Sequence, residues 1–266
     1  MINDFFIYRH AWRYNLNPDV EPKLTNFQCK ELLQDGGLMV RNTFDFDCKD
    51  ETQFWYIIKD SFGGMEELSS NVRRKIRRSL ELFEYGLIDR STISKQGYDI
   101  IDETYKNYKI KDRQMSQKIF DNYLKHCDNN NYDYWGIFDK ESKHLIGFCA
   151  VHLWNNCCEF GKTGIYSFYK KSSFYAYYGL YYKMNEYYLG EQHFKYVTDS
   201  SRSITEHSNI HQFLEQNFKF RKAYCKLKLH YKWWFGFIVR TLYPFRNIIP
   251  NRSVKAVLKM HGMQTK

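Results

Sequence analysis

Two side chains in the second half of the chain have the chemistry of a general base, Glu159 and His207. A carboxylate or an imidazole takes up a proton best when its pKa lies near the working pH. Alternation along a predicted strand places Cys157, Glu159 and Gly161 on one face, where burial among aromatic side chains would raise the pKa of the Glu159 carboxyl. The alternative for Glu159 is an exposed strand carboxylate with no catalytic role.

His207 belongs to a polar segment that begins with the turn at residues 199–203. Such a turn at the end of a central strand is a common place for functional groups, because loops there are free to face a cleft. We predict substrate contacts at Ser201 and Arg202, with Arg202 able to clamp a carboxylate or phosphate, and a further one at Tyr224 on the last strand. The alternative is that the serines here only cap the next helix.

The elements that position these groups follow from the spacing of apolar residues. The predicted helices are Met65 to Glu84 (ended by Gly86), two helices within Gly97 to Cys127, a helix from Phe174 to Leu189 and one starting near Asn209. The predicted strands are Leu38 to Arg41, Phe54 to Ile58, Tyr134 to Phe138, His144 to Trp154, Cys157 to Phe168, Phe194 to Thr198 and Ala223 to Tyr231. Asn155 and Asn156 form a predicted hairpin turn.

From Tyr98 to Tyr231 this order resembles the GNAT superfamily of acyl-CoA N-acyltransferases. The resemblance implies an α+β (α/β sandwich) fold with a mixed, mostly antiparallel central sheet flanked by helices. In that family, acyl-CoA lies between two splayed central strands, and the loop after the fourth strand offers backbone N–H groups to the pyrophosphate at a helix N-terminus. Here the resemblance implies cofactor contacts at Phe168, Tyr169, Lys170, Lys171, Ser172, Ser173, Phe174, Tyr178, Gly179 and Asn209.

Two family features differ in this sequence. The glycine signature is reduced to Ala176-Tyr177-Tyr178-Gly179-Leu180-Tyr181, which keeps only its first glycine. The tyrosine that commonly protonates the leaving thiolate, just before the corner at Phe218-Lys219-Phe220, is replaced by Glu215 or its neighbours. Fem-type (FemAB-like) peptidyltransferases, built from GNAT-like modules, are similar in another respect, the Arg/Lys-studded helix at residues 68–78.

The resemblance implies an N-acyltransferase that moves an acyl group from acyl-CoA to an amine of a small molecule or amino sugar by direct attack, with Glu159 or His207 as the base. The first alternative is a FemAB-like aminoacyl transferase that uses charged tRNA, with the basic helix gripping phosphates. The second is a GNAT-shaped binding protein without catalysis. His, Cys and Asp residues show no metal-binding spacing, so we predict no metal.

Charge is distributed unevenly along the chain. The net charge is +10, yet residues 216–266 hold 12 of the 40 Lys and Arg residues and no Asp or Glu. Tryptophan, phenylalanine and basic residues after Tyr231 suit peripheral docking on an anionic membrane. The alternative is that this tail packs against the domain. Binding of tRNA ranks below the membrane as a partner, since no recognised motif accompanies the charge.

Seven cysteines without a CxxC pair, and an N-terminus unlike a secretory signal, lead us to expect a cytoplasmic protein, peripheral at the inner face of the membrane if the tail docks there. The longest apolar run, Trp233 to Val239, is too short to span a bilayer. We predict three parts: an N-terminal α/β segment at 1–90, a GNAT-like domain at 91–231 and a basic aromatic extension at 232–266.

Overall fold

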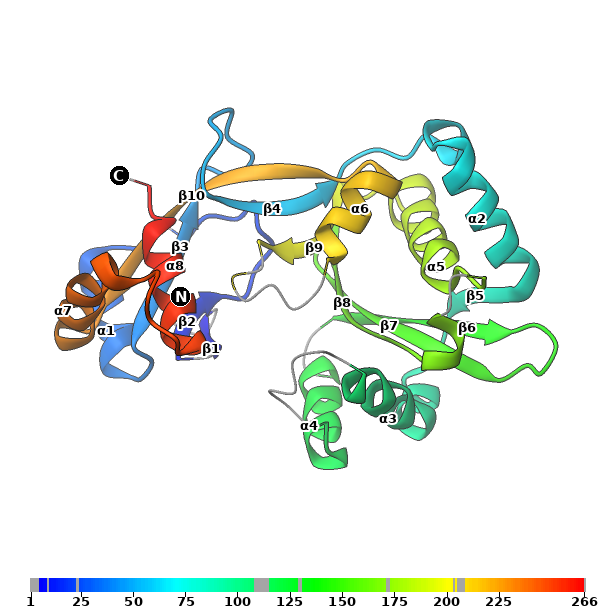
Figure 1. Cartoon of the computed structure of the whole chain (residues 1–266), viewed down its shortest axis with the longest axis horizontal. Helices are drawn as coiled ribbons and strands as arrows, with labels where there is room; N and C mark the ends of the chain where they lie inside the picture. Colours follow the sequence, from blue (N-terminus) through cyan, green and yellow to red (C-terminus); the bar gives the residue numbers. More distant parts are fainter. Residues whose placement is uncertain are drawn as a thin grey trace. The chain divides into compact units, whose positions relative to one another are not determined.

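The computed structural model describes residues 5–8, 10–22, 24–107, 115–128, 131–170, 173–202, 204 and 209–265 (Figure 1). The chain divides into two compact units. Unit 1 comprises residues 1–57, 201–206 and 222–266, and unit 2 comprises residues 58–200 and 207–221. Three strands, β4 (Phe54–Lys59), β9 (Tyr196–Ser201) and β10 (Arg221–Tyr231), carry the chain from one unit into the other.

Unit 1 is built on strands in the order β1-β2-β3-β10-β4. Besides β4 and β10, the elements of unit 1 are β1 (Phe5–Tyr8), β2 (Ala11–Tyr14), α1 (Asn26–Gln34), β3 (Met39–Phe44), α7 (Trp233–Leu242), η5 (Tyr243–Phe245) and α8 (Arg252–Gly262). β1 and β2 form an antiparallel pair, β2 runs parallel to β3, and β3 runs antiparallel to β10. Thr25 and Gln28 form a capping box that starts α1, whose Leu32 and Leu33 pack with Trp12 in the core of this unit.

Unit 2 contains strands in the order β9-β8-β7-β6-β5. Its elements are η2 (Gly64–Glu67), α2 (Ser70–Leu82), β5 (Phe83–Leu87), α3 (Arg90–Lys106), α4 (Gln117–Asp128), β6 (Tyr132–Asp139), β7 (Leu145–Leu153), β8 (Cys157–Ile165), η3 (Ser167–Lys170), α5 (Ala176–Asn185), the π-helix η4 (Glu186–Glu191) and α6 (Ile210–Phe218). Pairing is antiparallel from β5 to β8 and parallel between β8 and β9. This confirms the predicted mixed, mostly antiparallel sheet.

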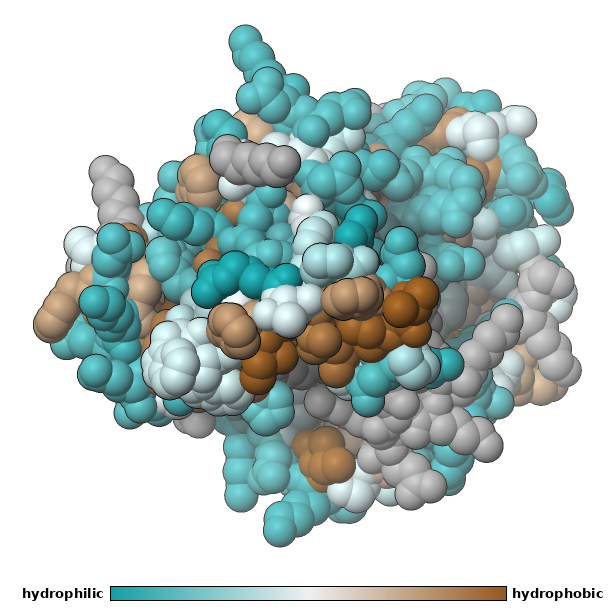
Figure 2. Space-filling view, turned by 60° about the vertical axis from the view of Figure 1, so that its left-hand side comes forward, coloured by the Kyte–Doolittle hydropathy of each residue, from teal (hydrophilic) through white to brown (hydrophobic). Residues whose placement is uncertain are grey.

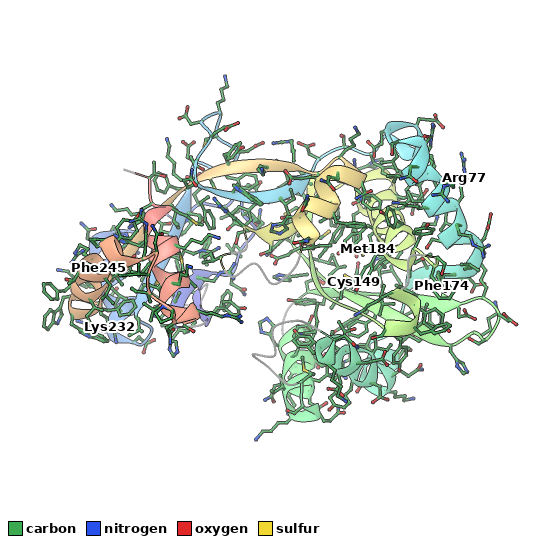
Figure 3. All side chains as sticks on the ribbon, viewed as in Figure 1. Arg77, Cys149, Phe174, Met184, Lys232 and Phe245 are labelled. Atoms are coloured by element: carbon green, nitrogen blue, oxygen red, sulfur yellow. The ribbon has the colours of Figure 1, made fainter. Side chains whose placement is uncertain are left out.

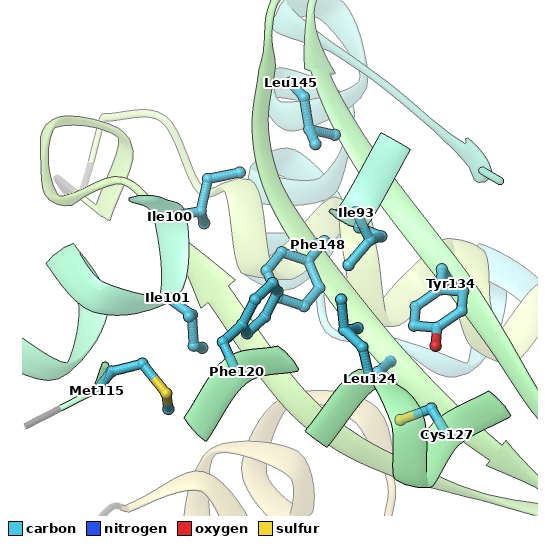
Figure 4. Close-up of a cluster of buried hydrophobic side chains, with 11 residues drawn as sticks. Ile93, Ile100, Ile101, Met115, Phe120, Leu124, Cys127, Tyr134, Leu145 and Phe148 are labelled. Atoms are coloured by element: carbon cyan, nitrogen blue, oxygen red, sulfur yellow. The ribbon is translucent and has the colours of Figure 1, made fainter. Parts of the chain in front are cut away.

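Helices cover both faces of the unit 2 sheet. On one face, Ile93, Ile100 and Ile101 of α3 and Phe120 and Leu124 of α4 pack with Phe148 of β7 in a buried cluster (Figure 4). On the other face, Tyr181 of α5 packs against Phe160 of β8, with ring centroids 5.8 Å apart. The alternation of the strands therefore sends one set of side chains to α3 and α4 and the other set to α5.

The prediction of one helix from Met65 to Glu84 is wrong at both ends. Residues 64–67 form a 3₁₀ turn, and α2 begins after Ser69, whose side chain accepts a hydrogen bond from the Val72 N–H. At the other end, Phe83 opens β5, which pairs with β6 along its whole length, so Gly86 lies within a strand. Burial of Phe83 and this long-range pairing outweigh the helical spacing of the local sequence.

The C-terminal segment forms helices, and one of them packs on β10. The Leu229 N–H donates to Gln264 Oε1 at 2.9 Å, and the Tyr231 hydroxyl lies 2.9 Å from His261 Nδ1. α7 instead leaves large apolar side chains in solvent, with Trp233 84% and Phe237 67% exposed. Within the described residues, no helix has both the length and the apolar character that crossing a bilayer requires.

Candidate active site

The parallel strands β8 and β9 pair only at their beginnings. The three paired positions are Cys157 with Tyr196, Cys158 with Val197 and Glu159 with Thr198. β8 continues to Ile165 and β9 to Ser201, but these described residues form no further pair with each other. The two strands therefore part after Glu159 and Thr198, and we call the region where they diverge the splay.

β8 carries a bulge beside the splay. Its register against β7 places Thr163 opposite Cys149 and Phe160 opposite Val151, so Gly161 and Lys162 together face the single residue Ala150. A Cβ atom on Gly161 would lie 2.8 Å from the Ala150 carbonyl oxygen, which explains the glycine. A bulge bends its strand and increases the local twist, and this one begins two residues after Glu159, where the pairing of β8 with β9 ends.

A histidine–aspartate pair lies where β9 leaves β8. His211, in the first turn of α6, places Nε2 2.9 Å from the Asp199 carbonyl oxygen and 3.5 Å from its carboxylate. Because a carbonyl oxygen only accepts hydrogen bonds, Nε2 carries the hydrogen, and Nδ1 is the basic nitrogen of the neutral ring. Burial alone would lower the pKa of His211, but the hydrogen bond to and the charge of Asp199 more than offset this, and the pKa is raised.

Asp199 is itself withdrawn from solvent. Burial raises the pKa of its carboxyl, against the opposing effect of the hydrogen bond to His211. A buried carboxylate that orients a histidine and stabilises its protonated form is a common arrangement at sites of proton transfer. The pair is therefore suited to accept a proton at near-neutral pH.

Three further side chains lie on the same face of the sheet. Thr163 donates a hydrogen bond to Cys149 Sγ at 3.2 Å and is also hydrogen-bonded to the Tyr181 hydroxyl. Burial, and then the charge of Asp199, raise the pKa of Tyr181 well above its usual value. Cys149, labelled in Figure 3, lies on β7. Burial raises the pKa of its thiol to about 12, so it stays protonated and is not a nucleophile. Cys149, Thr163, Tyr181, Asp199 and His211 form what we call the splay cluster.

Glu159 lies on the opposite face. It is paired across the sheet with His152, which is paired with Tyr132 in turn, and the His152 and Tyr132 rings stack at 4.7 Å. Asp199 follows Thr198, the partner of Glu159, and so points to the other side of the sheet. The structure thus places Glu159 beside the splay on the α3–α4 face, apart from the splay cluster. Its catalytic role stays a prediction, and His207 lies outside the described residues.

Most of the residues predicted to hold the cofactor lie in the segment that leads into α5, and Tyr178 and Gly179 lie within α5 itself. Phe168, Tyr169 and Phe174 pack together with Phe83, with centroid distances between 5.3 and 6.1 Å for the contacts that Phe174 makes. Phe168 and Ser173 are exposed. Lys170 is half-buried, and burial lowers the pKa of its ammonium group. Lys171 and Ser172 lie outside the described residues. Asn209 occupies the position before α6, without a side-chain cap hydrogen bond.

The start of α5 is fixed by contacts to α2 and β5. Ser79 donates to the Tyr175 carbonyl oxygen at 2.9 Å, and the Tyr85 hydroxyl donates to the Ala176 carbonyl oxygen at 3.1 Å. A Cβ atom on Gly179 would lie 2.4 Å from the Tyr85 hydroxyl oxygen, so this glycine is required for close packing. Tyr175, the residue before α5, has a left-handed backbone and makes no side-chain cap hydrogen bond, and its carbonyl oxygen accepts from the Tyr178 N–H at 2.8 Å.

Tyr178 connects three helices of unit 2. Its hydroxyl accepts from Lys75 Nζ of α2 at 3.0 Å and lies 3.3 Å from Asn217 of α6. Its ring packs edge-on against Phe213, with centroids 5.0 Å apart. The predicted contact residue therefore joins the basic helix to the two helices that border the splay.

The predicted substrate residues lie in unit 1. Ser201 accepts a hydrogen bond from Arg41 Nη2 at 3.3 Å. Arg202 Nη1 donates to the Gln53 carbonyl oxygen at 2.8 Å, and the Arg202 N–H donates to the Trp55 carbonyl oxygen. Tyr224 accepts from the Cys48 N–H through its carbonyl oxygen. Their role in substrate binding stays a prediction.

Sequence reasoning missed the Asp199–His211 pair. Asp199 stands at the end of a predicted strand and His211 two residues after the predicted helix start at Asn209, but nothing local shows that the two approach each other. In the described part of the chain, no three His, Cys, Asp or Glu side chains are arranged to hold a metal ion.

No protein-family model and no curated protein matches this sequence. Solved structures do resemble the fold. FemX matches with a TM-score of 0.50 and 10% identity over 77% of this chain and 68% of that one. L-PGS from Bacillus licheniformis matches with a TM-score of 0.50 and 10% identity over 89% and 77%. A spermidine N-acetyltransferase from Vibrio cholerae, in complex with CoA and spermine, has a TM-score of 0.33, 16% identity and coverage of 43% and 68%.

The fold is therefore GNAT-like and similar to those of FemX and L-PGS, as the order of elements predicted. The similarity to FemX and to L-PGS extends over most of the chain.

Proposed function

We propose that this chain is an acyltransferase that joins a carboxylic acyl group to an amine, with His211 as the base. The observation that supports this most strongly is the largely buried Asp199–His211 pair beside the splayed parallel strands. The amine nitrogen attacks the acyl carbonyl carbon and forms the C–N bond, and the bond to the leaving oxygen or sulfur breaks. The proton that the amine loses passes to His211 Nδ1 and is returned to the leaving atom, so the step needs no other reactant.

The donor we favour is an aminoacyl-tRNA, the donor of Fem-type transferases. Support comes from α2, which carries Arg73, Arg74, Lys75, Arg77 and Arg78 and packs beside α5. Arg73 pairs with Glu66 and Arg78 with Glu81, whereas Arg74 and Arg77 are exposed cations without a carboxylate partner among the described residues. Figure 3 shows Arg77 on the outer side of α2. Such a face suits the phosphates of a nucleic acid.

Acyl-CoA is the second candidate donor. The start of α5 supports it, because N–H groups without a side-chain cap at a helix N-terminus attract a pyrophosphate. Both donors present an acyl carbon next to phosphate groups, so the catalytic pair serves either one.

Thermal unfolding with acetyl-CoA, with a longer acyl-CoA and with aminoacyl-tRNA tests the donor. We expect aminoacyl-tRNA to raise the midpoint temperature at low salt, because a ligand that binds only the folded state stabilises it. Stabilisation by an acyl-CoA and not by aminoacyl-tRNA would indicate that acyl-CoA is the donor. Stabilisation by none of the three would contradict the transferase proposal and favour a binding protein.

For the C-terminal segment we propose peripheral docking on an anionic bilayer. Trp233, Trp234, Phe237 and Ile238 repeat at spacings of four on α7, and Phe245 and Ile248 follow; all six are exposed. Figure 2, which turns the left-hand side of Figure 1 forward, shows apolar side chains gathered within a hydrophilic surface. Arg240 and Arg246 are neighbouring cations, and aromatic side chains beside cations favour a membrane interface.

Sedimentation with vesicles tests this proposal. Wild-type protein is expected to sediment with vesicles of phosphatidylcholine and phosphatidylglycerol. Replacing Trp233 and Phe237 together with alanine should weaken binding by roughly tenfold or more, since each side chain buries apolar area on insertion. Phe27→Ala, a matched change at an exposed residue of α1, should leave binding unchanged. Equal sedimentation of wild type and the double variant would rule out docking through α7.

A further inference from the structure

Unit 1 contains a pocket whose lining residues all lie between positions 13 and 56, far in the sequence from the splay cluster. β2, β3 and β4 and the segment after β2 form its walls. The lining residues are Arg13, Tyr14, Leu16, Asn17, Pro18, Val20, Arg41, Thr43 and Tyr56.

Arg41 is a mostly buried cation in this pocket. Its guanidinium carbon lies 4.9 Å from the centre of the Phe54 ring, and Nη2 donates to Ser201 Oγ at 3.3 Å. Burial, and then the positive charge of Arg13, lower the pKa of Arg41 to about 10. A buried guanidinium usually has a carboxylate partner, because desolvation of an unpaired charge is costly.

The second cation approaches Arg41 through the strand register. β2 and β3 pair in parallel, with Ala11 beside Met39 and Trp12 beside Val40, so Arg13 and Arg41 follow at neighbouring positions. Like charges on adjacent strands destabilise a sheet. Arg13 stacks on Phe6 and Tyr8, at 5.9 and 5.5 Å, and neither arginine has a carboxylate partner within the residues that the structure describes.

The acidic groups near the pocket are engaged elsewhere. Asp19 accepts a hydrogen bond from the Asn17 side chain, and Glu21 accepts one from the Phe46 N–H at 3.1 Å. The charge imbalance therefore persists inside the pocket, where the lining includes Tyr14, Thr43 and Tyr56 and the Tyr56 side chain is hydrogen-bonded to Arg41.

We propose that this pocket binds an anionic group, a carboxylate or a phosphate, between Arg13 and Arg41. Its oxygen atoms accept charge-assisted hydrogen bonds from the two guanidinium groups, and the hydroxyl groups of the wall complete the shell. The bound anion relieves the repulsion between the arginines and offsets the desolvation of Arg41. The site is independent of the donor and of the acid–base pair, so it stands whether or not the chain transfers acyl groups.

Titration calorimetry and thermal unfolding with sodium phosphate and with sodium acetate, at constant ionic strength set by chloride, test the site. We expect at least one of the two anions to bind wild-type protein and to raise its midpoint temperature. The affinity should fall roughly 10- to 100-fold in Arg41→Met and in Arg13→Gln, which lose hydrogen bonds to a charged group. Lys30→Gln, an exposed change on α1, should behave as wild type. Preference for phosphate or for acetate identifies the source of the anion.

Stability without added anion supplies a second readout. Arg41→Met should unfold at a midpoint equal to or above that of wild type, because an apolar side chain replaces a mostly buried cation that has no carboxylate partner among the described residues. Arg13→Gln carries the binding test if Arg41→Met does not fold. The proposal is overturned if neither anion binds wild type, if binding survives in Arg13→Gln, or if folded Arg41→Met is markedly less stable without anion.

Discussion

Replacing His211 with alanine is expected to lower the rate of acyl transfer roughly 10²- to 10⁴-fold, the usual contribution of a positioned general base. The Asp199 carbonyl oxygen fixes the hydrogen on Nε2 and leaves Nδ1 as the basic nitrogen, and the alanine variant loses this imidazole. The measurement is the rate at which a labelled acyl group is transferred from the donor to an amine under single-turnover conditions. His144→Ala, at an exposed turn of unit 2, is the matched control and should retain full activity.

The same site predicts a particular dependence on pH. A general base must be deprotonated to act, and Asp199 raises the pKa of His211 above its usual 6.5. Activity should therefore increase with pH, and the midpoint of this increase (the limb of the pH profile) should lie above 6.5. Asp199→Asn removes the charge but keeps the backbone carbonyl. We expect that variant to be slower and its limb to move to lower pH, because burial alone lowers the pKa of histidine. An unchanged limb in Asp199→Asn, or full activity in His211→Ala, would remove the pair from the mechanism.

Reversing two charges on α2 should weaken tRNA binding on the order of 50-fold at 0.1 M salt. Each lost phosphate contact reduces the slope of log affinity against log salt by roughly 0.9, and Arg74→Glu with Arg77→Glu removes two. These two arginines were chosen because they are exposed and lack carboxylate partners among the described residues. Fluorescence anisotropy with labelled tRNA across a salt series gives both the affinity and the slope.

A second double variant controls for net charge. Lys118→Glu with Lys125→Glu changes two exposed lysines of α4 by the same amount. If this pair and the α2 pair lower affinity equally, the attraction is a general effect of charge and α2 is not the tRNA-binding face. If neither has an effect, an acyl-CoA donor gains support.

The sequence predicted those parts of the fold that depend on local pattern. The β7–β8 hairpin around Asn155 and Asn156, the helix after Asn209 and the strand ending at Tyr231 all lie where the alternation and turn residues indicated. β5 could not be predicted in this way, because Phe83 and Glu84 continue the helical pattern and Gly86 suggests a helix end, whereas the strand depends on pairing with β6. The limits of the three predicted parts stay a prediction.

The site was only partly accessible to sequence reasoning for the same reason. The polar segment at residues 199–203 was predicted to carry functional groups, but its first three residues belong to β9, and the partner of Asp199 comes from α6. The neighbouring positions of Arg13 and Arg41 depend on the parallel pairing of β2 and β3, which no short-range spacing reveals. Of the predicted site residues, Glu159 stands beside the splay, whereas Lys171, Ser172 and His207 lie outside the described residues.

The early parting of β8 and β9 has a further consequence for how a ligand is held. Beyond Glu159 and Thr198, the main chains of the two strands no longer serve each other as partners among the described residues. Main-chain amide and carbonyl groups seek hydrogen bonds, so an extended ligand that carries its own amides can complete the interrupted ladder as an added strand does. Binding of this kind depends on the spacing of the amide groups along the ligand and depends little on the protein side chains around the ligand.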